Sequence, residues 1–133
     1  MTKQRVFHKS YAAELVRIAR ADLEAAQILI AGKASRREII FFQIEQSIEK
    51  SLKAYLCKLG IAVPLTHDLN VILDRFPKQH PIPHADVLED LIEFATVRRY
   101  EEGAAILTDE ELTAAIKVAN DIVTLVEAAV SKP

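Results

Sequence analysis

The stretch that decides the fold is Phe41-Phe42-Gln43-Ile44-Glu45-Gln46-Ser47-Ile48-Glu49-Lys50-Ser51-Leu52-Lys53-Ala54-Tyr55-Leu56. Its apolar residues recur at steps of three or four, which places them on one face of a helix. Polar residues recur at the same steps on another face. The apolar stripe comprises Phe41, Ile44, Ile48, Leu52, Tyr55 and Leu59, and the polar face comprises Gln46, Glu49, Lys50 and Lys53. We expect the stripe to belong to the core, and the polar face to be either solvated surface or the edge of a site.

The composition predicts a single helical domain that spans residues 1–133. Half of the residues are apolar, Gly and Pro are few, and the common residue types are good helix formers. The formal net charge of −2 gives the molecule no overall attraction for nucleic acid, although a local basic patch is compatible with it. The single cysteine, Cys57, excludes an intramolecular disulfide and is expected to be a buried thiol. Neither a signal peptide nor a membrane span is evident, so a cytoplasmic location is expected.

Capping signals divide the chain into helices. Residues 1–9 are polar and are expected to be frayed or disordered. A first helix begins near Ser10, and Gly32 is placed to end it as a left-handed cap. Ser35-Arg36-Arg37-Glu38 has the pattern of a capping box for the long helix, which Gly60 ends.

The second half of the chain predicts three further helices. Thr66 is expected to cap a short one that Pro77 stops, and another runs from about His84 or Ala85 to Tyr100. Thr108-Asp109-Glu110-Glu111 is a second capping box, and it opens a last helix that ends near residue 130. Short connections between such helices predict an all-α, up-and-down antiparallel bundle of four to five helices.

Three polar clusters are candidates for chemistry, and each also has an ordinary structural explanation. Glu49 and Lys53 have the spacing of an ion pair on a wet helix face, worth roughly 0.3–0.5 kcal/mol. The second cluster, His67-Asp68, would suit the start of the short helix, and the third, Arg98-Arg99-Tyr100, would suit the end of the fourth. No phosphate-binding glycine loop and no metal-ligand spacing is present, so no cofactor or metal is expected.

Taken in order, these clusters resemble the HEPN family, whose name stands for higher eukaryotes and prokaryotes nucleotide-binding. The resemblance runs from about Ala19 through Tyr100. It is carried by Gln46-x-x-Glu49-Lys50-x-x-Lys53, Gly60, His67-Asp68-Leu69 and Arg99-Tyr100. It implies a bundle of four or five helices, a homodimer, and work with a minimal nucleotidyltransferase encoded beside it in a toxin–antitoxin-like system.

The resemblance also implies two alternative activities. Many members are ribonuclease toxins that carry an Arg followed, four to six residues later, by His. In this chain no His follows Arg98 or Arg99, and Arg75 and His80 have the spacing only across Pro77. The sequence therefore favours a module that binds nucleotide or a protein partner over an enzyme. The alternative is a degenerate ribonuclease acting on RNA, with Arg99 stabilising the transition state.

The predicted ligand-binding residues are Gln46, Glu49, Lys50, Lys53, His67, Asp68, Arg99 and Tyr100. The cations among them would form a small pocket for a nucleotide phosphate, with Tyr100 available to stack on a base. The competing interpretation is a polar network that fastens the helices together through Glu49, Asp68, Arg99 and Tyr100. A third hypothesis is a self-associating module, whose helices approach across a dimer at Ala25, Ala26, Ala115 and Ala119.

Overall fold

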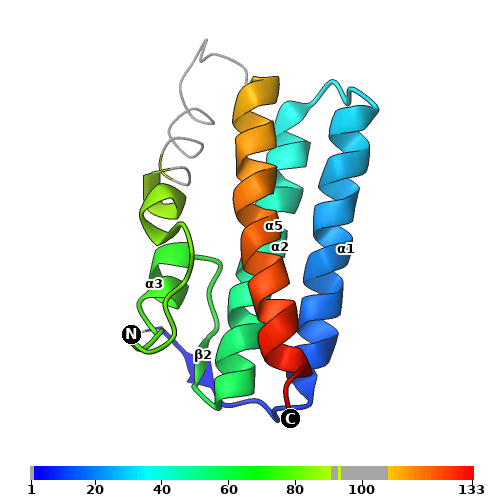
Figure 1. Cartoon of the computed structure of the whole chain (residues 1–133). Coiled ribbons are helices and arrows are strands. Elements are labelled where there is room, and N and C mark those ends of the chain that lie inside the picture. Colours follow the sequence, from blue (N-terminus) through cyan, green and yellow to red (C-terminus); the bar gives the residue numbers. More distant parts are fainter. Residues whose placement is uncertain (1, 91–92, 94–107) are drawn as a thin grey trace.

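A computed structural model describes residues 2–90, 93 and 108–133 of the chain. Three long helices stand side by side, with α5 and α2 both antiparallel to α1 (Figure 1). The elements are β1 (Gln4–Arg5), α1 (Tyr11–Ala31), α2 (Arg37–Leu59), β2 (Val63–Pro64), α3 (Leu69–Leu73) and α5 (Asp109–Ser131). The expected all-α bundle is confirmed. Residues 85–90 are helical as expected, while most of the predicted fourth helix, with Tyr100, lies outside the described residues.

The core is built from apolar stripes that repeat at steps of three and four along each long helix. This heptad-like spacing lets neighbouring helices pack nearly parallel. The predicted stripe of α2 is confirmed, because only Leu59 among its members is more than slightly exposed. Cys57 is buried as expected. The buried residues of α1 are Ala12, Val16, Ala19, Leu23 and Ala26, and those of α5 include Leu112, Ala115, Ala119, Ile122 and Val126.

Small residues of α1 and α5 pack against other helices of the same chain. Ala26, Ala115 and Ala119 are almost completely buried in the core, and Ala25 is half-buried. The contact across a dimer that the self-association hypothesis placed at these alanines is therefore wrong for three of the four. The homodimer itself stays a prediction.

Two of the expected helix ends are confirmed. Gly60 is in the left-handed conformation, with φ of 75°, and ends α2. Thr108 and Glu111 form the expected capping box at the start of α5, since each side chain accepts from the other's backbone N–H. Both signals are local, and both keep the geometry that their residue types favour.

Three other helix ends differ from the expectation by one or two residues. Gly32 has φ of −80°, and Lys33 takes the left-handed position, with Lys33 N–H bonded to Ile30 O and Ala34 N–H to Leu29 O. This is a Schellman motif shifted one residue beyond Gly32. The first capping box is absent, because α2 begins one residue later and Glu38 accepts from the side chain of Arg36 instead.

The cap of α3 is Asp68 rather than Thr66. The Asp68 carboxylate accepts from the backbone N–H of Asn70 at 3.0 Å, and Thr66 Oγ1 accepts from the backbone N–H of Asp68 at 3.1 Å. Thr66 therefore shapes the turn that leads into the helix, and Asp68 satisfies one of the helix's free N–H groups, that of its second residue.

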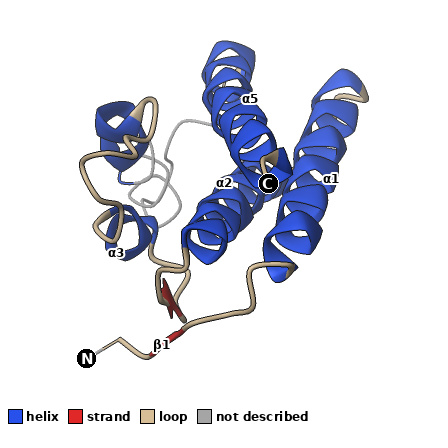
Figure 2. Cartoon of the chain, turned by 60° about the horizontal axis from the view of Figure 1, so that its bottom comes forward, coloured by secondary structure: helices blue, strands red, loops and turns tan. Residues whose placement is uncertain are grey.

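The N-terminal segment is paired rather than frayed over residues 4–5. β1 pairs with β2 in antiparallel register, Gln4 opposite Pro64 and Arg5 opposite Val63 (Figure 2). Leu65 adds a backbone bond to Lys3 O at 2.7 Å. The pairing arises because the extended connection between α2 and α3 offers backbone groups that the N-terminal segment satisfies. It fixes the path of the chain that leads to His67.

Candidate functional site

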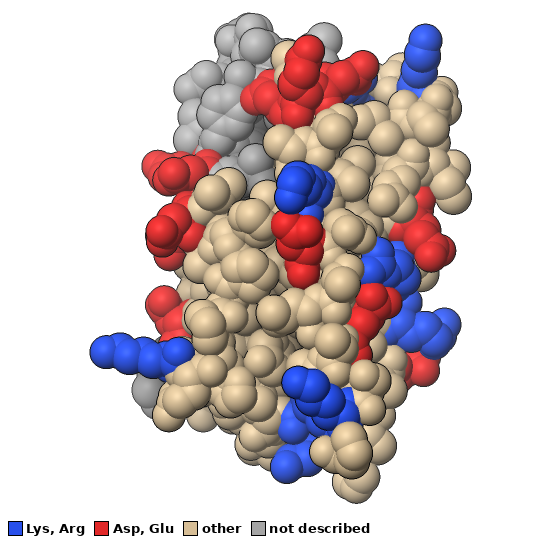
Figure 3. Space-filling model, in the orientation of Figure 1, with Lys and Arg blue, Asp and Glu red and all other residues tan. Residues whose placement is uncertain are grey.

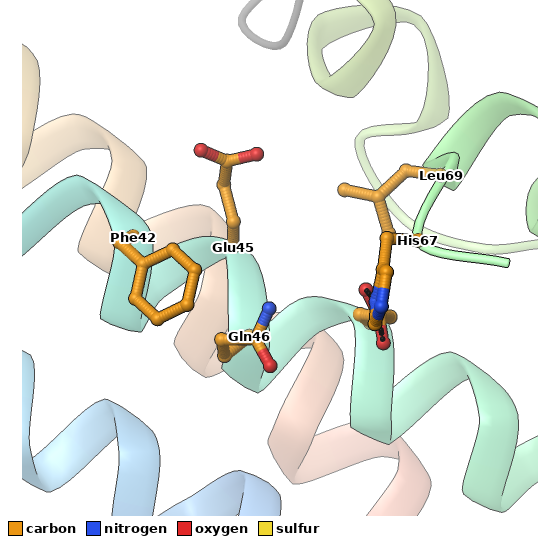
Figure 4. Close-up of a pocket in the computed structure, with 6 residues that line it drawn as sticks. Phe42, Glu45, Gln46, His67 and Leu69 are labelled. Atoms are coloured by element: carbon orange, nitrogen blue, oxygen red, sulfur yellow. Dashed lines mark hydrogen bonds and ion pairs between the residues drawn. The ribbon is translucent and has the colours of Figure 1, made fainter.

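A cleft of about 360 Å³ lies between α2 and the chain that enters α3. Its walls are Phe42, Glu45, Gln46, Glu49, His67 and Leu69. Figure 4 shows Phe42 and His67 at opposite ends of the group, with Gln46 between them. We call this feature the α2–α3 cleft.

The cleft forms beside the buried face of α2. Four of its residues recur at helical spacing beside the core stripe, so they face the same side of the bundle. On the other side, Leu69 and Ile72 are buried and anchor α3 against the core. Because Asp68 caps α3, His67 stands immediately before the helix and opposite Glu49.

The polar centre of the cleft is a triad of Glu49, His67 and Lys53. The Nδ1 atom of His67 lies 3.0 Å and 3.2 Å from the two carboxylate oxygens of Glu49, and Lys53 Nζ lies 3.2 Å from Oε2. The Glu49 side chain is 7% exposed, whereas that of His67 is 87% exposed. A carboxylate only accepts hydrogen bonds, so the contact assigns the proton to Nδ1 of the imidazole.

The structure brings some of the predicted site residues together and separates others. Gln46, Glu49 and His67 line the cleft, and Lys53 joins them through Glu49. Lys50 instead pairs with Asp22 of α1 at 2.6 Å, and Asp68 caps α3. Arg99 and Tyr100, like Arg98, lie outside the described residues, so their part in a site stays a prediction.

The Glu49–Lys53 pair exists with the predicted spacing, but it does not lie on a wet face. The two side chains are 7% and 17% exposed. A buried carboxylate needs partners, and Lys53 and His67 supply them. The contact between Glu49 and His67 also ties α2 to the chain before α3, which is part of the structural network that the sequence suggested as an alternative.

The charge of the described walls differs from the cationic pocket that the sequence suggested. Lys50 and Lys53 each have a carboxylate partner, and Glu45 adds a second carboxylate to the lining. Among the described wall residues of the cleft there is no lysine or arginine. On the face in Figure 3 acidic and basic side chains are interspersed over the described residues. The described walls therefore suit a donor-rich, uncharged part of a ligand better than its phosphate.

Sequence reasoning missed Phe42 and Glu45. Phe42 is 50% exposed and lies at the end of the cleft away from His67. A signal for it existed, because adjacent residues of a helix point about 100° apart. With Phe41 in the core stripe, its neighbour had to present a large aromatic ring to another face.

A shallower, mostly apolar groove of about 230 Å³ continues from Phe42 toward the start of α2. It is lined by Arg36, Glu38, Ile39 and Phe42, and Ile39 is 39% exposed. We call this feature the Ile39 groove. It puts exposed apolar surface next to the polar cleft.

The pair with ribonuclease-like spacing has other partners. The Arg75 guanidinium donates to Gln4 Oε1, and His80 Nδ1 lies 3.1 Å from the hydroxyl of Tyr55. Over the described ranges, no three His, Cys, Asp or Glu side chains gather as a metal site would require. No helix in the part of the chain that the structure describes is long and apolar enough to cross a membrane.

Comparison with known proteins gives one family. The model of the HEPN domain matches residues 12–129, a span that includes the whole of α2, the α2–α3 cleft and all but the last residues of α5. Searches of curated proteins and of solved structures give no significant match.

Proposed function

Because the chain belongs to the HEPN domain family, we propose that it binds a nucleotide and holds the nucleoside part in the α2–α3 cleft. The observation that carries the proposal is the combination of an exposed aromatic ring with a polar centre in one cleft. Its volume of about 360 Å³ lies within the range of small-molecule sites, roughly 300–1,000 Å³.

Each wall supplies a contact that a nucleoside uses. The half-exposed ring of Phe42 offers a stacking face, which any base can use. The amide of Gln46 both donates and accepts, so it suits the edge of a base. Glu49 and His67 supply polar atoms at the far end. A nucleoside carries no charge, which agrees with described walls that contain no lysine or arginine.

The phosphate is expected to extend out of the described walls. In this arrangement Arg99 and Tyr100, which the family resemblance singled out, keep their predicted roles with the phosphate and the base. Those roles remain proposals, because both residues lie outside the described part of the chain.

Isothermal titration calorimetry with AMP, GMP, CMP and UMP tests the proposal. We expect micromolar to millimolar binding of at least one of them, and a weaker affinity in Phe42→Ala and Gln46→Ala. Tyr11→Ala is the matched control, because Tyr11 is an aromatic residue of similar exposure, 43%, on α1 and outside the cleft. Binding of none of the four nucleotides would contradict the proposal.

A second candidate function is contact with a protein partner, for which the family resemblance suggests a minimal nucleotidyltransferase in a two-gene, toxin–antitoxin-like system. The Ile39 groove favours it, because Ile39 and Phe42 expose apolar surface side by side. An affinity pull-down from the native cell extract, read by mass spectrometry, would recover the nucleotidyltransferase. Ile39→Ser should lose it, whereas Val87→Ser, at an exposed aliphatic residue outside the groove, should retain it.

A further inference from the structure

The geometry of His67 points to a specificity that deepens the proposed function and rests on it. We propose that His67, held by Glu49, accepts a hydrogen bond from the 2′-hydroxyl of a ribose, so that the α2–α3 cleft selects ribonucleotides over deoxyribonucleotides. Three steps lead from the observed contacts to this role: the orientation of the imidazole, the free atom that it presents, and the part of a nucleoside that reaches it.

The first step is the orientation. The Glu49 side chain is 7% exposed and contacts His67 through both carboxylate oxygens, while Lys53 holds one of those oxygens as well. An exposed histidine on a loop would ordinarily sample several rotamers. Here a buried charged acceptor holds Nδ1–H, as the carboxylate partners of functional histidines do elsewhere.

The second step is the free atom. When Nδ1 of a neutral imidazole carries the proton, Nε2 carries a lone pair and only accepts. The His67 side chain is 87% exposed, and within the described residues its hydrogen-bond contacts are those of Nδ1 with Glu49. Nε2 therefore offers an acceptor to a ligand, and the ligand must supply a donor.

The third step is the register of a nucleoside along α2. Phe42 and Glu49 are seven residues apart, so they lie about 10 Å apart along the helix axis. This is comparable to the length of a nucleoside from its base to its sugar. A base stacked on Phe42 therefore places the ribose at the His67 end. Gln46, which lies between Phe42 and His67 (Figure 4), would then be next to the base.

The 2′-hydroxyl of a ribose is the donor that fits this position. It is neutral, which suits a centre whose carboxylate is already compensated, and it is what distinguishes RNA components from DNA components. Losing one neutral hydrogen bond of this kind weakens binding by about tenfold. We expect the effect from the 2′-hydroxyl and not from the 3′-hydroxyl, which deoxyribonucleotides also carry.

Calorimetry of the full chain with the tightest-binding ribonucleotide and its 2′-deoxy and 3′-deoxy forms tests the inference. We expect about tenfold weaker binding of the 2′-deoxy form but not of the 3′-deoxy form, with the preference lost in His67→Ala. His8→Ala is the matched control, an exposed histidine outside the cleft, and should keep the preference. Equal affinity for the ribonucleotide and its 2′-deoxy form, with binding still dependent on Phe42, would overturn this inference and leave the proposed function standing. No binding of any form would overturn both.

Nitrogen-15 NMR of the imidazole gives a second readout that does not depend on a variant. We expect the free protein to show the Nδ1–H tautomer of His67, and Nε2 to shift when the ribonucleotide binds. An Nε2–H tautomer in the free protein, or an unchanged Nε2 resonance at saturation, would overturn the assignment of the acceptor.

Discussion

Replacing Glu49 by Gln should destabilise the fold strongly, although the two side chains have nearly the same shape. The side chain is 7% exposed, and its carboxylate compensates the charge of Lys53, which is 17% exposed. In Glu49→Gln the ammonium group stays largely buried and loses its counter-charge. His67 loses its charged partner at the same time.

The size of the effect follows from the geometry. At the observed Nζ to Oε2 distance of 3.2 Å, the attraction is about 5 kcal/mol with an effective dielectric constant of 20. Breaking a fully buried pair costs roughly 3–5 kcal/mol. Lys53 reaches some water and Gln keeps an acceptor oxygen, so we expect the free energy of unfolding to fall by about 2–3 kcal/mol.

Urea denaturation followed by circular dichroism measures this difference. Glu14→Gln is the matched control, because Glu14 is exposed on α1 and should leave the midpoint unchanged. In a Lys53→Met background the same Glu49 exchange should cost much less, since the uncompensated cation is gone. If the free energy of unfolding falls by less than about 0.5 kcal/mol in the wild-type background, the pair is well solvated and the reasoning from its burial is wrong.

Three further predictions concern the fold, each checked by urea denaturation. Gly60→Ala should lower the free energy of unfolding by about 1–2 kcal/mol, because Gly60 has φ of 75°, a left-handed conformation that disfavours a side chain. Lys33 has φ of 56°, so Lys33→Gly should relieve the same strain and raise the free energy of unfolding by up to about 1 kcal/mol. Ser51→Ala should raise it by up to about 1 kcal/mol, because the buried hydroxyl has no hydrogen-bond partner among the described residues, and Ser47→Ala should not, since Ser47 donates to Ile44 O. Burial raises the pKa of the Cys57 thiol. The stabilising contribution of the neutral thiol should therefore be fully present below the ordinary cysteine pKa and be lost as the pH rises through the folded-state pKa. Cys57→Ala should remove this pH dependence of the free energy of unfolding.

The parts of the fold that the sequence predicted are those that local chemistry decides. The stripe of α2, the left-handed Gly60 and the capping box of Thr108 and Glu111 each depend on neighbouring residues alone. The missed caps at Lys33 and Asp68 lie one or two residues from the predicted positions. Helices capped at positions this close differ in free energy by less than packing contributes, so the contacts of the whole bundle determine which cap forms.

The site was predictable to the extent that helix spacing defines it. Gln46 and Glu49 share a face of α2 by periodicity, but the contact of Glu49 with His67 depends on the path of residues 60–68. That path is held by the β1–β2 pairing, whose two-residue strands leave no readable pattern in the sequence. The partner of Lys50 is Asp22, an interhelical choice that spacing within α2 does not reveal.

Glu49 belongs to the fold and to the proposed site, and this decides which variants can test function. A Glu49 variant that fails to bind nucleotide would be ambiguous, because the same exchange removes the charge that compensates Lys53 inside the protein. His67 lies on the other side of the same contact with 87% of its side chain exposed, so it can be changed without leaving a cavity in the core. A loss of ribose preference in His67→Ala at unchanged stability would therefore report on the cleft, and it would separate recognition by the imidazole from the structural network that holds it.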